Sequence, residues 1–201
     1  MPDSAASPAP HFYALDLPTR QRLVEQAAQA GETLVFRWAT LASEATDSWL
    51  ARAEQAAALI GPQRSVIDLG CGMMTLERFL PPGTTYIPVD VVARDARTLV
   101  VDLNRDGMPA LSADCLVGLG ILEYVYDLPR LLQGIAASCL TALLSYNTLE
   151  RFPDRAQRTG HAWVNHHTQA ELEALIQANG LRIVERIQLD TTQTMWRLAR
   201  A

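Results

Sequence analysis

One short segment constrains the fold of this chain more than any other: the apolar run at residues 65–69, which ends in Gly70-Cys71-Gly72. It predicts a buried strand that stops in a tight turn, where glycines let the backbone approach a ligand closely. A second apolar run, residues 86–89, ends at Asp90, whose carboxylate could accept hydrogen bonds from a ribose diol. A glycine turn followed by such an acid predicts a nucleoside-cofactor site at the carboxyl edge of a parallel sheet.

Two classes of cofactor use this layout. A dinucleotide site needs Gly-x-Gly-x-x-Gly, whose turn opens a helix that holds a pyrophosphate. Here Thr75 occupies the third glycine position, and the bulky Met73 and Met74 stand where phosphates would lie. The turn therefore favours a cofactor without phosphate, and an NAD-dependent oxidoreductase is the weaker alternative.

Length and charge limit the remaining classes. A chain of 201 residues that is 49% hydrophobic is long enough for one compact α/β domain with a sizeable core. The net charge is −5, and the 17 basic residues are all Arg and scattered along the chain. A nucleic-acid partner would need a clustered basic surface, so we expect none.

The three cysteines, Cys71, Cys115 and Cys139, include no Cys-x-x-Cys pair, and each lies in or beside an apolar run. We expect them to be small buried hydrophobic residues rather than disulfides or metal ligands, and we predict no metal site. The N-terminus has no signal-peptide pattern, and no apolar stretch approaches the ~18 residues of a membrane span. These features predict a cytoplasmic protein with no membrane partner.

Composition and periodicity divide the chain into three parts: a disordered lead at 1–10, a helical cap at 11–62 and an α/β domain at 63–201. In the cap, a helix is predicted from Asp16 to Gly31, and a second helical region at 32–60 with a break near 43–47. In the α/β domain, strands and helices alternate, as in a parallel sheet with right-handed crossovers. Strands are predicted at 65–69, 85–90, 98–102, 115–119, 141–146, 181–189 and 194–198. Helices are predicted at 75–80 and 128–138, and a further helix begins at the capping box of residues 168–171 and ends at Asn179-Gly180.

The sequence Val-Ile-Asp-Leu-Gly-Cys-Gly at 66–72 resembles motif I of the class I S-adenosylmethionine (SAM)-dependent methyltransferases. Residues 113–125 resemble that family's Asp-hydrophobic run followed by Leu-Glu-His, with Tyr124 in place of the histidine. Residues 163–168 resemble the Trp-x-Asn-His-x-Thr segment of many small-molecule methyltransferases. The resemblance, from 66 to 198, implies an α/β fold with a Rossmann-like, mostly parallel seven-stranded sheet and an antiparallel last strand, here with an N-terminal helical extension.

The resemblance also implies which residues would hold SAM, or its product S-adenosylhomocysteine (SAH). The methionine end would lie at the glycine turn, the ribose at the end of the second strand, and the adenine at the end of the third. In chain order the expected cofactor residues are Asp68, Gly70, Cys71, Gly72, Asp90, Val91, Asp102, Leu103, Leu119 and Gly120. An alternative role for Asp102 is to cap the turn at 104–107.

Two residues are candidates for catalysis. His166 is the first choice for a general base, with His161 and His167 in reserve, because histidine titrates near neutrality. Its alternative role is to fix the loop around the cleft. Tyr124 could hydrogen-bond a substrate or simply fill the wall of the site.

The segment at 147–162 follows the fifth strand, at the edge where ligands bind in open α/β sheets. It is longer than most connections, which is typical of lids and binding loops. Its arginines, Arg151, Arg155 and Arg158, could meet an anionic substrate or form one solvated helix face.

We therefore predict methyl transfer from SAM to a small-molecule or saccharide-like acceptor, with O-methylation favoured over N-methylation. The chain has no Asn/Asp-Pro-Pro-Tyr/Phe block of the kind that marks many nucleic-acid amino-group methyltransferases. A non-catalytic SAM-binding protein is the main alternative. The N-terminal helices could serve as a lid or as the contact of a homodimer.

Overall fold

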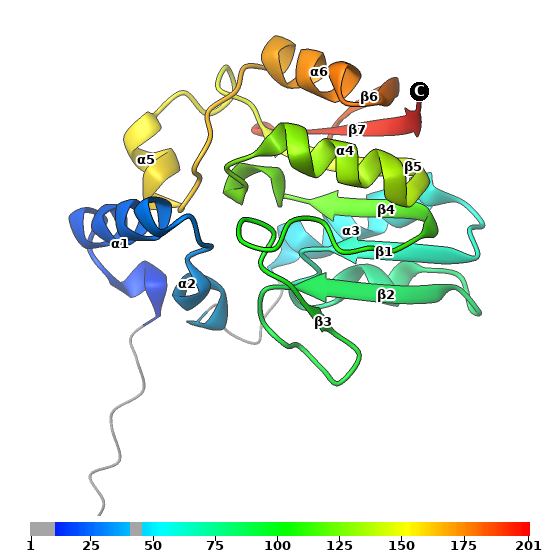
Figure 1. The fold of residues 1–201 in the computed structure, drawn as a ribbon, viewed down its shortest axis with the longest axis horizontal. Helices are drawn as coiled ribbons and strands as arrows, with labels where there is room; N and C mark the ends of the chain where they lie inside the picture. Colours follow the sequence, from blue (N-terminus) through cyan, green and yellow to red (C-terminus); the bar gives the residue numbers. More distant parts are fainter. Residues whose placement is uncertain (1–10, 41–45) are drawn as a thin grey trace, which may run out of the picture.

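The computed structural model describes residues 11–40 and 46–201, which form a seven-stranded sheet with helices on both faces (Figure 1). The strand order is β3-β2-β1-β4-β5-β7-β6. The strands are β1 Ser65–Leu69, β2 Thr85–Asp90, β3 Leu99–Val100, β4 Ala113–Leu119, β5 Cys139–Asn147, β6 Leu181–Gln188 and β7 Gln193–Arg200. The α-helices are α1 Leu17–Ala30, α2 Val35–Thr40, α3 Asp47–Ile60, α4 Leu128–Ser138, α5 Arg155–Gly160 and α6 Gln169–Ala178, and the 3₁₀ helices are η1 Phe12–Ala14, η2 Thr75–Phe79 and η3 Leu122–Tyr124.

The first five strands pair in parallel, and β7 lies between β5 and β6, antiparallel to both. This confirms the predicted fold class, including the antiparallel last strand. Parallel order brings the carboxyl ends of β1, β2 and β4 to one edge of the sheet, which is where open α/β sheets bind ligands.

Two layers of apolar side chains cover the two faces of the sheet. On one face, α4 and α6 pack through residues such as Leu132 and Ile176 against β1, β4 and β5. On the other, the alanines of α3 pack against Val66 and Cys115. All three cysteines are buried free thiols, as predicted, and burial raises the pKa of Cys115 to about 11. Because α3 shares the core of the sheet, we call α1, α2 and η1 the cap; the division predicted at 11–62 and 63–201 stays a prediction.

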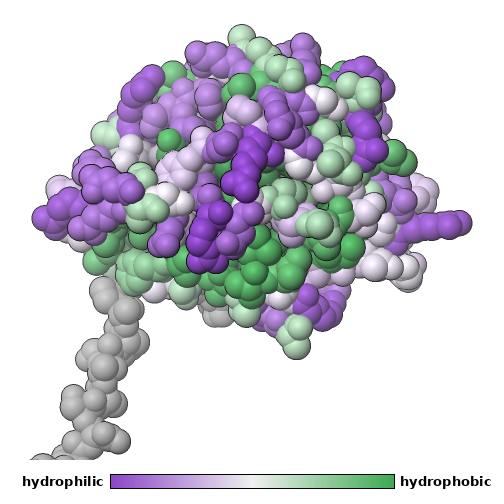
Figure 2. Space-filling view, viewed as in Figure 1, coloured by the Kyte–Doolittle hydropathy of each residue, from purple (hydrophilic) through white to green (hydrophobic). Residues whose placement is uncertain are grey.

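The cap shares a small apolar cluster of Phe12, Val24 and Ala162 with the segment after α5, and α1 packs against α5 (Figure 1). Helix α1 begins and ends at the residues predicted from the sequence. The Asp16 side chain accepts a hydrogen bond of 2.7 Å from the Thr19 amide, and Gly31 ends α1 with φ +69°. The space-filling view shows mainly hydrophilic residues over the α1 end and hydrophobic residues in the middle of its lower part (Figure 2).

Several predicted elements differ in extent. The helix expected at 75–80 is a 3₁₀ helix, η2, and the strand expected at 98–102 has only two residues, β3. The long segment after β5 contains the short helix α5. The predicted lead at 1–10, and most of the break predicted near 43–47, fall outside the described residues. Within residues 11–40 and 46–201, no helix is long and apolar enough to span a bilayer.

Candidate functional site

A cavity of about 670 Å³ opens at the carboxyl ends of β1, β2 and β4, between the sheet and the cap. The turn after β1 forms its floor. Gly70 and Cys71 donate their amides to the Val89 carbonyl (2.8 and 3.0 Å), and Gly72 donates its amide to Oδ2 of Asp90 (2.8 Å). Gly70 has φ +73°, and a Cβ there would lie 2.9 Å from Ile121, so this position requires glycine.

Asp90 is buried at the end of β2 and lies on the cavity wall. Its second oxygen, Oδ1, accepts the Val92 amide (2.9 Å) and an N–H of Arg94 (3.4 Å). A carboxylate has about four lone-pair positions, so Asp90 retains capacity for further donors such as ribose hydroxyls.

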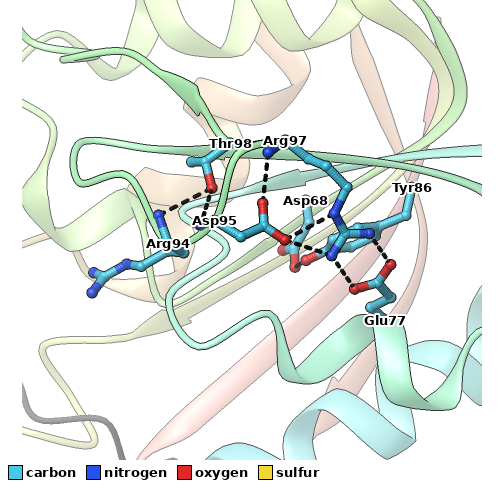
Figure 3. A network of polar contacts seen from close by, with 7 residues as sticks. All are labelled: Asp68, Glu77, Tyr86, Arg94, Asp95, Arg97 and Thr98. Atoms are coloured by element: carbon cyan, nitrogen blue, oxygen red, sulfur yellow. Dashed lines mark hydrogen bonds and ion pairs between the residues drawn. The ribbon is translucent and has the colours of Figure 1, made fainter.

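Hydrogen bonds within the connection from β2 to β3, and ion pairs within it and to η2, fix its position (Figure 3). Thr98 Oγ1 accepts the amides of Arg94 and Asp95 at 3.1 Å, and Arg97 pairs with both Asp95 and Glu77 on η2. Although such exposed pairs contribute little individually, together they fix the loop that carries Arg94. The acid at the end of β2 is thus held in one orientation.

Two buried carboxyl groups, those of Asp68 and Glu123, and the partly buried Arg52 lie on the cavity wall near the ends of β1 and β4. Tyr86 donates a hydrogen bond to Asp68 (2.6 Å), and burial raises the pKa of Asp68 to about 7, against the opposing effects of Tyr86 and Arg52. Glu123 accepts two hydrogen bonds from Asn147 through Oε1, and its buried Oε2 has no partner among the described residues. Arg52 donates a hydrogen bond to the Gln193 side chain (2.8 Å), and its buried Nε has no acceptor among the described residues.

The other end of the cavity is lined by aromatic rings from the cap and from the segment after α5. Trp38 and Tyr124 meet edge to face with centroids 4.7 Å apart, and His161 lies 5.3 Å from Trp163. Trp163 donates its indole N–H to the Tyr124 hydroxyl (3.1 Å). Burial raises the pKa of Tyr124 to about 12, so this phenol is neutral at physiological pH.

Most of the predicted site residues lie together on the wall of this cavity. Asp102 does not. It is buried at the end of β3, where it accepts hydrogen bonds from the amide and hydroxyl of Thr33 (3.0 and 2.5 Å) and from the Asn104 amide (3.0 Å). Its carboxylate therefore caps the turn, the alternative role, and also holds the cap. The predicted residues on the wall are Asp68, Gly70, Cys71, Gly72, Asp90, Val91, Leu103, Leu119, Gly120 and Tyr124.

His166 also lies off the cavity wall. Its Nδ1 accepts a hydrogen bond of 3.0 Å from Nε of Arg158, and burial lowers its pKa. Arg158 itself is fully buried and donates to the carbonyls of Asn147 and Phe152 and to the Tyr146 hydroxyl. Both expectations for Arg158, substrate contact and a solvated face, are thus wrong: it holds the loop together. His161, one of the reserve histidines, lies on the wall instead.

Sequence reasoning missed several wall residues from distant parts of the chain: Arg37 and Trp38 on α2, Trp49 and Arg52 on α3, and Gln193 on β7. Their local sequences carry only a helix or strand pattern. One signal could have found them. An arginine next to an aromatic residue, such as Arg37-Trp38, in an N-terminal helix that could serve as a lid points to a side chain that faces the cleft.

The turn is poorly suited to a dinucleotide. A pyrophosphate site needs the N-terminus of a helix, but here the turn leads into the five-residue 3₁₀ helix η2. Met74 adopts φ +54°, the left-handed conformation that favours glycine, and it lies off the cavity wall, whereas Met73 lies on it.

No family model matches the sequence, and no curated protein matches it. Solved structures do match the fold. The mitomycin 7-O-methyltransferase MmcR superimposes with a TM-score of 0.60 at 17% identity, over 94% of this chain and 70% of MmcR. The riboflavin-derivative N,N-dimethyltransferase RosA from Streptomyces davawensis gives 0.60 at 15%, over 94% and 71%. Magnesium protoporphyrin IX methyltransferase ChlM from Synechocystis PCC 6803, with bound SAM, gives 0.59 at 13%, over 98% and 100%. The chain thus has the fold of the SAM-dependent methyltransferases.

Proposed function

We propose that this protein is a SAM-dependent methyltransferase that methylates an oxygen atom of a small molecule. The observation that carries the proposal is the single cavity that joins the glycine turn and Asp90 at one end to a ring-lined chamber at the other. Such a cavity can hold a nucleoside cofactor and an acceptor in contact. The matching structures support the reaction class, since those named above include both O- and N-methyltransferases of small molecules.

The groups on the wall fit the parts of SAM. The unpartnered Nε of Arg52 suits the α-carboxylate, and the buried carboxyl groups of Asp68 and Glu123 suit the ammonium group. Asp90 suits the ribose hydroxyls. The glycine turn supplies room, since a Cβ on Gly72 would have no atom nearer than 3.9 Å.

When bound, SAM supplies a methyl group on a positively charged sulfur, so the protein has to orient the acceptor and exclude water. Alignment of this kind can contribute ~7–11 kcal/mol to lowering the barrier. The rings of Trp38, Tyr124 and Trp163 limit the space open to water beside the acceptor.

His161 replaces His166 as the proposed general base. Its Nδ1 shares a hydrogen bond with the Tyr13 hydroxyl (3.3 Å), and if Nδ1 carries the proton, the lone pair of Nε2 can take the proton of an acceptor hydroxyl. Burial, with the nearby charges of Arg37 and Arg20, lowers the pKa of His161. The ring is therefore neutral at pH 7 and able to accept a proton, as methylation of a hydroxyl would require.

Turnover tests the proposal. Purified protein is incubated with methyl-labelled SAM and a panel of hydroxylated and aminated small molecules, and labelled product is counted. Labelled ethers on hydroxyl acceptors are expected. SAH binding without turnover on any acceptor would favour the non-catalytic alternative, and labelled amines alone would overturn the preference for oxygen.

A further inference from the structure

Arg37 is a charged side chain on the cavity wall that has no counter-charge among the described residues. Arg37, on α2, is only 4% exposed, and no salt bridge involves it within residues 11–40 and 46–201. Of the several N–H groups of its guanidinium, one donates to the Tyr13 hydroxyl (2.8 Å). Nε and Nη1 are buried and have no hydrogen-bond partner in the described part of the chain. Buried charges in proteins are normally paired and hydrogen-bonded.

Aromatic rings partly compensate this charge. The Arg37 Cζ lies 4.0 Å from the centroid of Trp38 and 4.8 Å from that of Tyr124, with Tyr13 at 5.5 Å. A ring face attracts a cation but offers no acceptor in the plane of the guanidinium. The N–H groups of Arg37 therefore still require an anionic or polar acceptor, and the cavity is where one can enter.

The second arginine on the cavity wall, Arg52, is only partly buried and lies elsewhere. Arg52 lies beside the cofactor end, where its Nη1 is 3.1 Å from a Cβ built on Gly120, and it interacts electrostatically with Glu123, Tyr124 and Asp68. Arg37 instead lies against the rings of Trp38 and Tyr124, and its charge also acts on His161. The two guanidinium groups thus differ in their contacts: Arg52 is hydrogen-bonded to Gln193, and Arg37 lies among the aromatic rings.

We infer that the acceptor is a planar aromatic carboxylate, with its carboxylate on Arg37 and its ring among the aromatic side chains of the chamber; this rests on the proposed function. A guanidinium fork matches the geometry of a carboxylate in two parallel hydrogen bonds. Flat rings pack well against aromatic walls in offset or edge-on contact. The rings that line the chamber are those of Tyr13, Trp38, Tyr124, His161 and Trp163.

This assignment also positions the reaction. Tyr13 contacts both Arg37 (2.8 Å) and His161 (3.3 Å), so a carboxylate on Arg37 lies near the proposed base. A hydroxyl on the same ring, within reach of His161, is the group that would lose its proton, so a hydroxyaryl carboxylate satisfies the cation, the rings and the base together.

Binding of simple probes tests the inference without knowledge of the natural acceptor. Benzoate and its neutral isostere benzamide are titrated into the wild-type protein saturated with SAH, with tryptophan fluorescence as the readout, because Trp38 and Trp163 line the chamber. Benzoate is expected to bind at least about tenfold more tightly than benzamide. Equal affinities would overturn the inference, and this comparison needs no variant to fold.

A matched pair of variants locates the effect. Arg37→Gln should weaken benzoate binding about tenfold or more and leave benzamide and SAH affinities within about twofold. Arg151→Gln, an exposed arginine outside the cavity, should change none of them. Undiminished benzoate binding by a folded Arg37→Gln variant would overturn the inference.

SAH titration separates the two failures. If SAH binds but benzoate is not preferred, the acceptor class is wrong and the methyltransferase proposal stands. If benzoate is preferred and sensitive to Arg37 while SAH does not bind, the anion site stands and the proposed function fails.

Discussion

At the scale of single residues, the most informative group is the buried acid of the glycine turn. Asp68 is 4% exposed, and burial, reinforced by the negative charge of Asp90, raises its pKa to about 7. In the unfolded chain an aspartate titrates near ~3.9. The folded protein therefore binds this proton more tightly than the unfolded chain, and ionising Asp68 costs stability between these two pH values.

The raised pKa of Asp68 predicts in which direction the stability changes with pH, and this can be measured. As pH rises from 5 to 8, the free energy of unfolding of the wild type should fall by roughly 2–3 kcal/mol relative to Asp68→Asn, because the variant has no proton to lose. Urea unfolding at both pH values provides the comparison. A constant difference between the two proteins would show that Asp68 titrates normally. SAH affinity of the wild type should rise over the same range, as the ionised carboxylate attracts the ligand's ammonium group.

The two histidines that follow Arg158 in the chain, His161 and His166, give a second prediction. His161→Gln should lower kcat by about 10²-fold or more, since general-base catalysis typically contributes that much, and leave SAH affinity unchanged. Because burial lowers the pKa of His161, the wild-type rate should fall only at a pH below the ordinary range of histidine, and the variant should lose this acid limb.

His166→Gln is the matched comparison, because glutamine retains an acceptor for Arg158 and the residue lies off the cavity wall. Its kcat should stay close to that of the wild type. A large loss of kcat in this variant, with an unaffected His161→Gln protein, would return the base to His166.

At the scale of elements, short polar contacts attach the cap to the sheet. Asp102 at the end of β3 binds Thr33 between α1 and α2, and Asn104 donates to both Thr33 (3.0 Å) and the Tyr124 carbonyl (2.8 Å). Arg94 donates to the carbonyl of Trp38 (3.4 Å) as well as to Asp90. The helix that carries Arg37 is thus tied to the same loops that shape the cofactor end.

A double-mutant cycle tests this attachment. Asp102→Ala should lower the free energy of unfolding by about 1.5–3 kcal/mol, the contribution of hydrogen bonds to a charged group. Thr33→Val removes one side of the same contact, so the double variant should cost less than the sum of the single ones, with a coupling of about 0.5–3 kcal/mol. Additive losses, together with weaker SAH binding in Asp102→Ala alone, would instead support the adenine contact expected from the sequence.

Elements with strong local signals could be predicted from the sequence. Asp16 and Gly31 define α1, the capping box of Thr168 and Glu171 starts α6, and apolar runs give the strands close to their observed bounds. The glycine turn and Asp90 follow from the same reasoning, because both lie next to strands whose order could be inferred. The positions of these residues depend on neighbours that are close in the sequence.

The acceptor end could not be predicted in the same way. Arg37, His161 and Trp163 come together only when α2 and the segment after α5 fold over the sheet edge. Arg158 shows the difficulty most clearly: its spacing from Arg151 and Arg155 indicates a solvated face, yet carbonyls from its own loop bury it. The spacing of residues in the sequence does not show which carbonyl groups will accept hydrogen bonds from them in the folded chain.

At the scale of the whole molecule, the sheet edge supplies one end of a cavity and the cap supplies the other. The parallel strands bring Asp68, Asp90 and Gly120 to one edge, and the cap adds the rings and Arg37. The central claim is that the edge end holds the nucleoside of SAM, since both the reaction and the acceptor site depend on it.

Calorimetric titration with SAH tests this claim most directly. The wild-type protein should bind SAH with micromolar affinity, Asp90→Ala should lose roughly 1–3 kcal/mol of binding free energy, and Glu54→Ala, an exposed residue of α3 off the cavity wall, should bind as the wild type does. NAD should not bind, given the short η2. Absence of SAH binding by folded wild-type protein, or NAD binding in its place, would contradict the account.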